Sequence, residues 1–189
     1  MIDPASVAFD VDGVIADTMT LFLDIARDEF DISGIRYENM TCYALEECLD
    51  VDPAVIRAIL VRILEGSYSA PLKPMAGAAK VLTKLIRYCD PLLFITARTG
   101  PETIHEWFRK LLPVHPGAFR VIATGTFEAK TDVLQKHGIR YFVEDRLETC
   151  FQIKAAGIEP VVYSQPWNRE HHPFMEVKNW SELELLIDF

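Results

Sequence analysis

Apolar residues along this chain recur in two periods, one typical of buried strands and one typical of amphipathic helices. Residues 7–9 form a short apolar run, which predicts a buried strand. In residues 18–30 the apolar positions instead share one helical face, whose members are Phe22, Ile25, Ala26 and Phe30. A strand followed by an amphipathic helix is therefore expected at the start of the chain.

A second helix is expected over residues 52–66. Asp52 can cap its first turn, Pro53 suits the first helical position, and Gly66 can end it. Its apolar stripe consists of Val55, Ile56, Ile59, Leu60 and Ile63. Residues 70–77 then carry two prolines and a glycine, a composition that predicts a linker or hinge.

After this linker, predicted strands and helices alternate. Apolar runs predict strands over 91–96, 119–123, 141–145 and 159–163. Helical patterns occupy 78–89, 101–112, 129–138, 146–157 and 181–189, the last with a capping-box pattern at Ser181 and Glu184. Such alternation predicts an α/β fold with a doubly wound parallel sheet. Residues 18–73 interrupt it, and we interpret them as a small helical cap inserted after the first strand into a core of residues 1–17 and 74–189.

Polar side chains gather at the carboxyl ends of the predicted strands, where a doubly wound sheet binds its ligands. The polar residues at these positions are Asp10, Asp12, Thr96, Arg98, Glu144 and Asp145, and Ala97 lies between Thr96 and Arg98. Clustered carboxylates repel one another and need a cation, and hard oxygen ligands suit Mg²⁺. Lys130 opens a predicted helix, where its charge opposes the helix dipole. A residue that breaks such a local rule often belongs to a functional site.

Composition and charge narrow the range of partners. The chain has 189 residues, 50% of them hydrophobic, which is enough for one domain or for one domain with a small insertion. Its net charge of −9 argues against binding a nucleic acid polymer, although a metal ion and local cations permit a small anionic ligand.

The compartment is also predicted from the sequence. We see no signal peptide and no membrane-spanning run, and four cysteines without a CxxC pair fit reduced thiols. A cytoplasmic protein without membrane partners is therefore expected. The oligomeric state stays open, and a homodimer is one option.

Carboxylates, Mg²⁺, a lysine and a hydroxyl together are suited to phosphoryl transfer. The lysine and the metal neutralise charge on the transferring group, while the hydroxyl holds its oxygens. One carboxylate can attack phosphorus and form an aspartyl-phosphate. The other, two residues away, can protonate the leaving oxygen and then activate water. The spacing of Asp10 and Asp12 is consistent with this division of labour.

Four ordered segments resemble the motifs of the haloacid dehalogenase-like hydrolase superfamily. They are "DVDGV", "ITAR", "AKTD" and "VED", and the resemblance spans residues 7 to about 163. It implies a Rossmann-like core, with Asp10 as nucleophile and Asp12 as general acid/base whose backbone carbonyl also binds Mg²⁺. Asp145 would be the other metal carboxylate. Glu144 departs from the common form of the fourth motif, and its alternatives are support of the site or local capping.

The same resemblance identifies the phosphate-binding candidates as Thr96, Ala97, Arg98 and Lys130. Arg98 has an alternative, which is pairing with a surface acid such as Glu102. Dehalogenases and phosphonatases of the superfamily lack an acid at the position of Asp12, so its presence favours phosphate esters.

The short cap, the segment 128–146 and the late "SQPWNR" are similar to the 5'(3')-deoxyribonucleotidase family. That resemblance implies a Mg²⁺-dependent phosphatase that acts on a nucleoside monophosphate, with a deoxynucleotide favoured. Cap aromatics can stack on a base in such enzymes, and the candidates here are Tyr37, Tyr43 and Tyr68. Trp167 and Asn168 could seal the cleft edge or pin their loop. The alternatives are a sugar-phosphate phosphatase or phosphomutase of the same superfamily, or a non-catalytic member.

Overall fold

The computed structural model describes residues 1–89 and 91–189. Its centre is a six-stranded sheet in which all neighbouring strands are parallel. The strand order is β3-β2-β1-β4-β5-β6, with β1 Val7–Phe9, β2 Leu92–Thr96, β3 Phe119–Ala123, β4 Tyr141–Glu144, β5 Glu159–Tyr163 and β6 Met175–Val177. The order changes direction between β1 and β4, which is the switch point where such sheets bind ligands. The predicted α/β, Rossmann-like fold class is confirmed.

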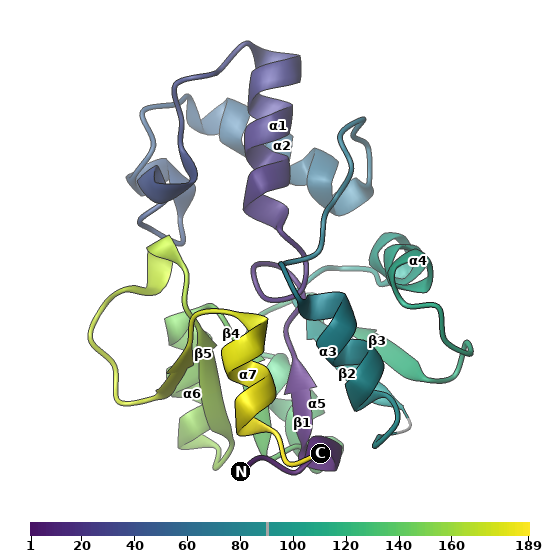
Figure 1. Ribbon diagram of the computed structural model, residues 1–189. Coiled ribbons are helices and arrows are strands. Elements are labelled where there is room, and N and C mark those ends of the chain that lie inside the picture. The colour runs from purple at the N-terminus through teal and green to yellow at the C-terminus, as the bar shows by residue number, and fades with distance from the viewer. Residues whose placement is uncertain (90) are drawn as a thin grey trace.

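Helices cover both faces of the sheet (Figure 1). One face packs against α3 (Ala78–Leu85), α4 (Glu102–Leu111) and α7 (Trp180–Leu186), and the other against α5 (Lys130–Lys136) and α6 (Leu147–Ala155). Short 3-10 turns occupy Pro4–Ser6, Tyr37–Asn39, Leu45–Glu47 and Pro166–Asn168. The sheet is thus the middle layer of three.

Strand β1 is anchored from both faces. Ala8 packs with the cluster under α5 and α6, whereas Phe9 packs with the cluster under α3, α4 and α7. The Phe9 ring stacks on Trp180 of α7, with ring centroids 5.5 Å apart. Burying a phenylalanine contributes roughly 1.5–3 kcal/mol. This packing fixes the end of β1, and therefore fixes the position of Asp10 just beyond it.

Helices α1 (Thr18–Phe30) and α2 (Pro53–Glu65) lie above the carboxyl ends of the strands, away from the two termini (Figure 1). Both helices begin where predicted, and the Asp52 side chain caps α2 as expected by accepting from Ala54 N. Asp17, which was not predicted as a cap, accepts from Thr20 N and caps α1. Gly66 ends α2 with φ +74°. The two segments that connect these helices to the sheet run side by side, because Asp17 N donates to Lys73 O over 2.8 Å.

The C-terminal region differs from the prediction. The last helix begins at Trp180, and its N-cap is Asn179, whose side chain accepts from Glu182 N. The predicted capping box at Ser181 and Glu184 is therefore wrong, because two similar polar pairs lie close together in the sequence. Strand β6 was not predicted either, since a run of three residues carries little periodicity.

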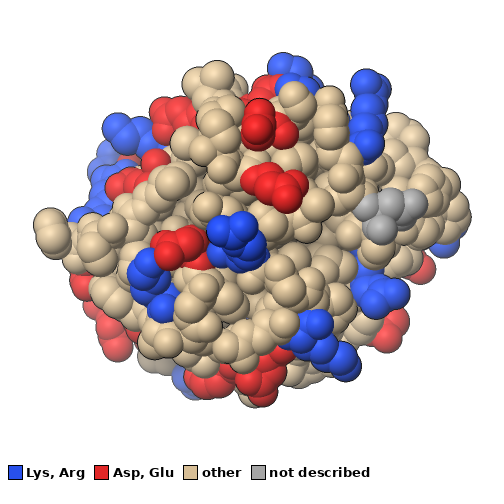
Figure 2. Space-filling view, turned by 90° about the horizontal axis from the view of Figure 1, so that it is seen from below, with Lys and Arg blue, Asp and Glu red and all other residues tan. Residues whose placement is uncertain are grey.

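Charged residues are interspersed on the face opposite α1 and α2. Figure 2 shows that face, where Lys and Arg lie among Asp and Glu without a large cluster of either sign. Among the described residues, no helix has both the length and the apolar character needed to cross a membrane.

Candidate active site

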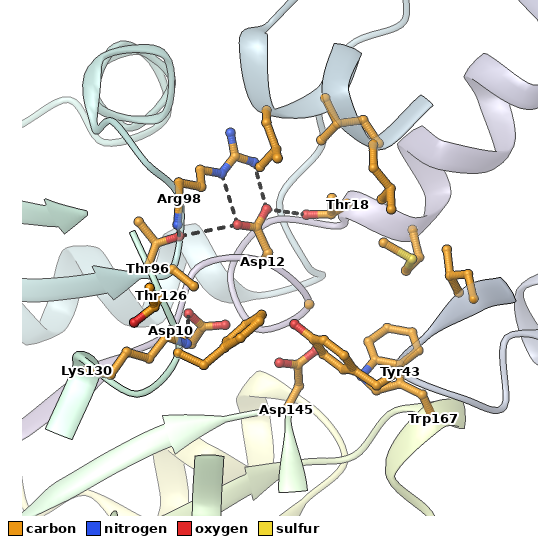
Figure 3. Close-up of a pocket in the computed structure, with 18 of the residues that line it drawn as sticks. Asp10, Asp12, Thr18, Tyr43, Thr96, Arg98, Thr126, Lys130, Asp145 and Trp167 are labelled. Carbon is orange, nitrogen blue, oxygen red and sulfur yellow. Dashed lines mark hydrogen bonds and ion pairs between the residues drawn. The ribbon is translucent and has the colours of Figure 1, made fainter. Parts of the chain in front are cut away.

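A pocket of about 560 Å³ lies between the carboxyl edge of the sheet and the helices α1 and α2 (Figure 3). Its sheet side carries the predicted residues Asp10, Asp12, Thr96, Ala97, Arg98, Lys130 and Asp145. Its opposite wall is mainly apolar and consists of Met19, Cys42, Tyr43, Leu45, Leu60, Ile63 and Leu64. The pocket therefore has one charged end and one apolar end.

Lys130 lies buried between two carboxylates. It is the first residue of α5 and is 1% exposed, and its Nζ lies 2.7 Å from Asp10 Oδ1 and 2.7 Å from Glu144 Oε2. Burial would lower the pKa of Lys130, but these two carboxylates raise it above its ordinary value. The position that breaks the helix-dipole rule is thus occupied by a paired ammonium group.

Glu144 supports this cluster from below. Its Oε1 accepts hydrogen bonds from the backbone N–H groups of Asp145 and Arg146, at 3.0 and 3.2 Å, while Oε2 accepts from Lys130. Both alternatives considered for Glu144 are therefore present in one side chain, which caps the following turn and holds Lys130.

The surroundings of Asp10 and Asp145 raise the pKa values of both carboxyl groups. Burial, followed by the charge of Glu144, raises the pKa of Asp10 to about 8. Burial, Glu144 and Asp10 likewise raise the pKa of Asp145 well above its ordinary value. One lysine does not neutralise three acids, so a further cation would stabilise the group.

Oxygen atoms of Asp10, Glu144 and Asp145 lie within 4.8 Å of one another. An all-oxygen donor set of this kind fits a hard divalent cation such as Mg²⁺, which binds one or two carboxylates and keeps waters. Both oxygens of Glu144 already accept hydrogen bonds, from Lys130 Nζ and from the backbone N–H groups of Asp145 and Arg146. Asp10 and Asp145 are therefore the carboxylates better placed to bind a metal. The cluster can therefore hold a divalent metal.

Asp12 is turned away from this cluster, toward Arg98. The guanidinium donates two bonds to it, from Nη2 to Oδ1 at 2.7 Å and from Nε to Oδ2 at 3.0 Å (Figure 3). Burial alone would raise the pKa of Asp12, but Arg98 holds it below its ordinary value. The structure therefore pairs Arg98 with an acid, as one alternative expected, although the partner is Asp12 and not Glu102.

Asp145 is oriented by the loop after β5. Trp167 Nε1 donates to Asp145 Oδ2 over 3.0 Å, and Asn168 Nδ2 donates to the Asp145 carbonyl over 2.8 Å. Trp167 also lines the pocket, and its bond to Asp145 ties its loop to the site. Gly13 faces the same carboxylate: it has φ +78°, and a Cβ there would lie 2.1 Å from Asp145 Oδ2.

The three candidate tyrosines occupy different surroundings. Tyr43 lines the pocket, with its ring edge-on to Phe127 at a centroid distance of 5.6 Å. Tyr37 instead donates its hydroxyl to Gln165 over 2.9 Å, beside Trp167. Tyr37 and Tyr68 are not among the residues that line the pocket in the described part of the chain.

Sequence patterns did not reveal two of the contacts in this site. Thr18 bonds Asp12, and its position at the start of a helix gave no sign of that contact. The second contact is the close approach of Gly13 to Asp145. A glycine directly after Asp12 was a usable signal for a tight turn there, but not for its neighbour.

This chain is similar to known proteins over nearly its whole length. The model of the family described as "5' nucleotidase, deoxy (Pyrimidine), cytosolic type C protein" matches residues 4–188. The 5'(3')-deoxyribonucleotidase of Bacillus subtilis is 21% identical over 181 residues, which cover 94% of this chain and 95% of the relative. A putative 5'(3')-deoxyribonucleotidase of Staphylococcus aureus is 23% identical over 183 residues, which cover 95% of this chain and 93% of the relative.

Solved structures share the fold. A haloacid dehalogenase-superfamily hydrolase from Geobacter sulfurreducens superposes with a TM-score of 0.61 at 18% identity, covering 95% of this chain and 94% of its own. At this identity the likeness concerns the fold.

Proposed function

We propose that this chain, which belongs to the 5' nucleotidase, deoxy (pyrimidine), cytosolic type C family, removes the phosphate from deoxynucleoside monophosphates. It is a phosphatase of the haloacid dehalogenase-like superfamily, nucleotidase-like by homology. The deoxynucleotide substrate, the aspartyl-phosphate mechanism, the use of Mg²⁺ and the cytoplasmic location are the proposal. The observation that carries it is the pocket with one charged end and one apolar end.

Asp10 is the nucleophile in this proposal. One of its oxygens attacks phosphorus, a new O–P bond forms, the ester O–P bond breaks, and the leaving oxygen takes a proton from Asp12. Water then attacks phosphorus, Asp12 accepts its proton, and the Asp10 O–P bond breaks to release phosphate. Lys130, already 2.7 Å from Asp10 Oδ1, lies where it can stabilise negative charge on the phosphoryl oxygens.

Thr96, Ala97 and Lys130 are the residues that we assign to phosphate binding, and all three line the charged end of the pocket. Asp10 and Asp145, with the Asp12 backbone carbonyl, would hold Mg²⁺, while Glu144 holds Lys130. Mg²⁺ supplies positive charge that stabilises the transferring phosphoryl group.

The apolar end of the pocket supports a nucleoside over a sugar. Leu60, Ile63, Leu64 and Met19 offer no hydrogen-bonding groups to sugar hydroxyls, whereas a base can lie against them and against Tyr43. Stacking on an aromatic ring contributes about 1–3 kcal/mol per base. We assign these residues to a cap formed by residues 18–73, inserted into a core of residues 1–17 and 74–189.

The test is phosphate release from a panel of deoxynucleotides, ribonucleotides and sugar phosphates, with Mg²⁺ and with a chelator. We expect Mg²⁺-dependent release with the highest kcat/KM on deoxynucleoside monophosphates. Release from sugar phosphates alone would contradict the substrate assignment, and equal release with the chelator would contradict the metal assignment. Leu64→Lys, placed in the apolar wall, should raise KM for nucleotides and leave p-nitrophenyl phosphate hydrolysis nearly unchanged.

A further inference from the structure

The Asp12 carboxylate is held by an unusually complete set of donors. Besides the two bonds from Arg98, Oδ1 accepts from Thr18 Oγ1 over 2.8 Å, and Oδ2 accepts from Thr96 Oγ1 over 3.4 Å. These donors come from three places, namely the start of α1, the end of β2 and the residues just after β2. The plane and direction of the carboxylate are therefore fixed from several sides (Figure 3).

Arg98 is placed to orient this group and not to serve as a surface charge. It is 5% exposed, and two of its nitrogens, Nε and Nη2, are occupied by Asp12. Its backbone N–H also donates to Thr96 Oγ1 over 3.3 Å, which orients one of the other donors. A buried ion pair adds little net stability compared with apolar packing. Stability alone therefore does not account for the fork of two hydrogen bonds from Arg98 to Asp12.

The two halves of the proposed reaction use Asp12 differently. In the first half it gives a proton to the leaving oxygen, and in the second half it takes a proton from water. Three of the four contacts are 3.0 Å or shorter and fix the carboxylate, whereas the Thr96 contact to Oδ2 is 3.4 Å. Oδ2 is therefore the oxygen that is better able to accept a proton, as the second half requires. The arrangement seen here thus matches the hydrolysis of the aspartyl-phosphate.

We propose that Arg98 is a positioning residue that holds the Asp12 carboxylate in the orientation in which it accepts a proton from the attacking water. In this step a water O–P bond forms, the Asp10 O–P bond breaks, and the water proton passes to Asp12. This role rests on the proposed function. It differs from phosphate binding, the first expectation for Arg98, because the guanidinium acts through Asp12.

Kinetics of Arg98→Gln on two substrates test this role. A deoxynucleotide and p-nitrophenyl phosphate leave the same aspartyl-phosphate, so slow hydrolysis of that intermediate gives both the same kcat. We expect kcat of the variant to fall about 10- to 100-fold and to become equal for the two substrates. The value of kcat/KM should stay near that of the wild type. A burst of one p-nitrophenol per active site should precede the steady state.

Other outcomes would overturn the inference. An equal fall in kcat and kcat/KM would show that Arg98 acts in the first half of the reaction, the transfer of phosphate to Asp10. A raised inhibition constant for inorganic phosphate would show that Arg98 contacts phosphate directly. Arg98→Lys keeps the charge but lacks the fork, so full activity in that variant would show that orientation is not the role. If the wild-type enzyme hydrolyses neither substrate, the proposed function itself fails.

Thr18→Val supplies a second test that leaves Arg98 in place. It removes one hydrogen bond to Asp12 Oδ1 at constant side-chain size. We expect a smaller fall in kcat, with kcat/KM again retained. If Thr18→Val has the wild-type kcat and the same burst behaviour as the wild type, the inference is contradicted. That result would hold even if Arg98→Gln failed to fold.

Discussion

Lys130 Nζ lies 2.7 Å from Asp10 Oδ1, although the two residues are 120 positions apart in the chain. Asp10 follows the central strand β1, and Lys130 is the first residue of α5. Their contact is made inside the protein, and Glu144 approaches the same ammonium group from β4. The position of the proposed nucleophile therefore depends on contacts that form only when the sheet is folded.

Lys130→Met should destabilise the protein in a pH-dependent way. Removing one partner of a buried ion pair costs about 3–5 kcal/mol. Without Lys130 the pKa of Asp10 would rise further above its unfolded value, so the folded variant would bind extra protons. The free energy of unfolding of the variant should therefore fall, relative to wild type, as pH rises through about 8, where Asp10 of the wild type loses its proton and Asp10 of the variant keeps it.

Urea unfolding at pH 6 and pH 9 measures this difference. Lys136→Met is the matched control, because Lys136 is exposed at the other end of the same helix. It should change stability by less than about 0.5 kcal/mol. A loss for Lys130→Met that is the same at both pH values would contradict the assignment.

Mg²⁺ affinity should increase with pH. The pKa of Asp10 is about 8 because of burial and the nearby Glu144 charge, and the pKa of Asp145 is raised as well. Below pH 8 Asp10 holds a proton that the metal must displace, and the raised pKa of Asp145 acts in the same direction. Titration calorimetry in buffers of different ionisation enthalpy should show proton release and a smaller Kd at pH 8 than at pH 6. A Kd independent of pH would contradict this description of the cluster.

Trp167→Phe should weaken metal binding without unfolding the protein. It removes the N–H that bonds Asp145 Oδ2 and keeps most of the ring surface. Loss of a group that orients a metal ligand typically costs 10–100-fold in affinity, so we expect a rise of about tenfold in Kd. Trp107→Phe is the control, because Trp107 Nε1 bonds the Leu72 carbonyl instead. Equal affinities in the two variants would count against the role of Trp167.

Gly13→Ala should lose more stability and more activity than the strain of its backbone conformation alone would cause. The added Cβ would lie 2.1 Å from Asp145 Oδ2, and Gly13 has φ +78°. Gly157→Ala is the matched control, since Gly157 has φ +84° and no atom within 4 Å of the added Cβ. The control should lose about 1–2 kcal/mol and keep its activity. Gly13→Ala with equal stability loss and full activity would contradict the close approach.

Much of the fold was predictable because its signals are local. The helix 18–30 and the helix that starts after Asp52 occur where the apolar faces and caps placed them. The fold class also followed from the alternation of strands and helices, and the resemblance to the superfamily is confirmed by the family match. Strand β6 and the cap at Asn179 were missed, because three residues or one polar pair do not define a period.

The partners of the site residues were less predictable than their positions. Parallel strands bring their carboxyl ends together, and that rule placed Asp10, Lys130 and Asp145 on one pocket. The direction in which a side chain turns depends on neighbours that are distant in sequence. Thus Arg98 turns to Asp12 at a separation of 86 residues, a choice that spacing along the chain did not predict.

The most direct test of the central claim is covalent phosphate on Asp10. Wild type and Asp10→Asn would be mixed with a deoxynucleoside monophosphate and Mg²⁺, quenched in acid within one turnover, and examined by peptide mass spectrometry. We predict one phosphate on the peptide that contains Asp10 in the wild-type enzyme, and neither modification nor phosphate release in Asp10→Asn. Phosphate release by Asp10→Asn at the wild-type rate would contradict the account.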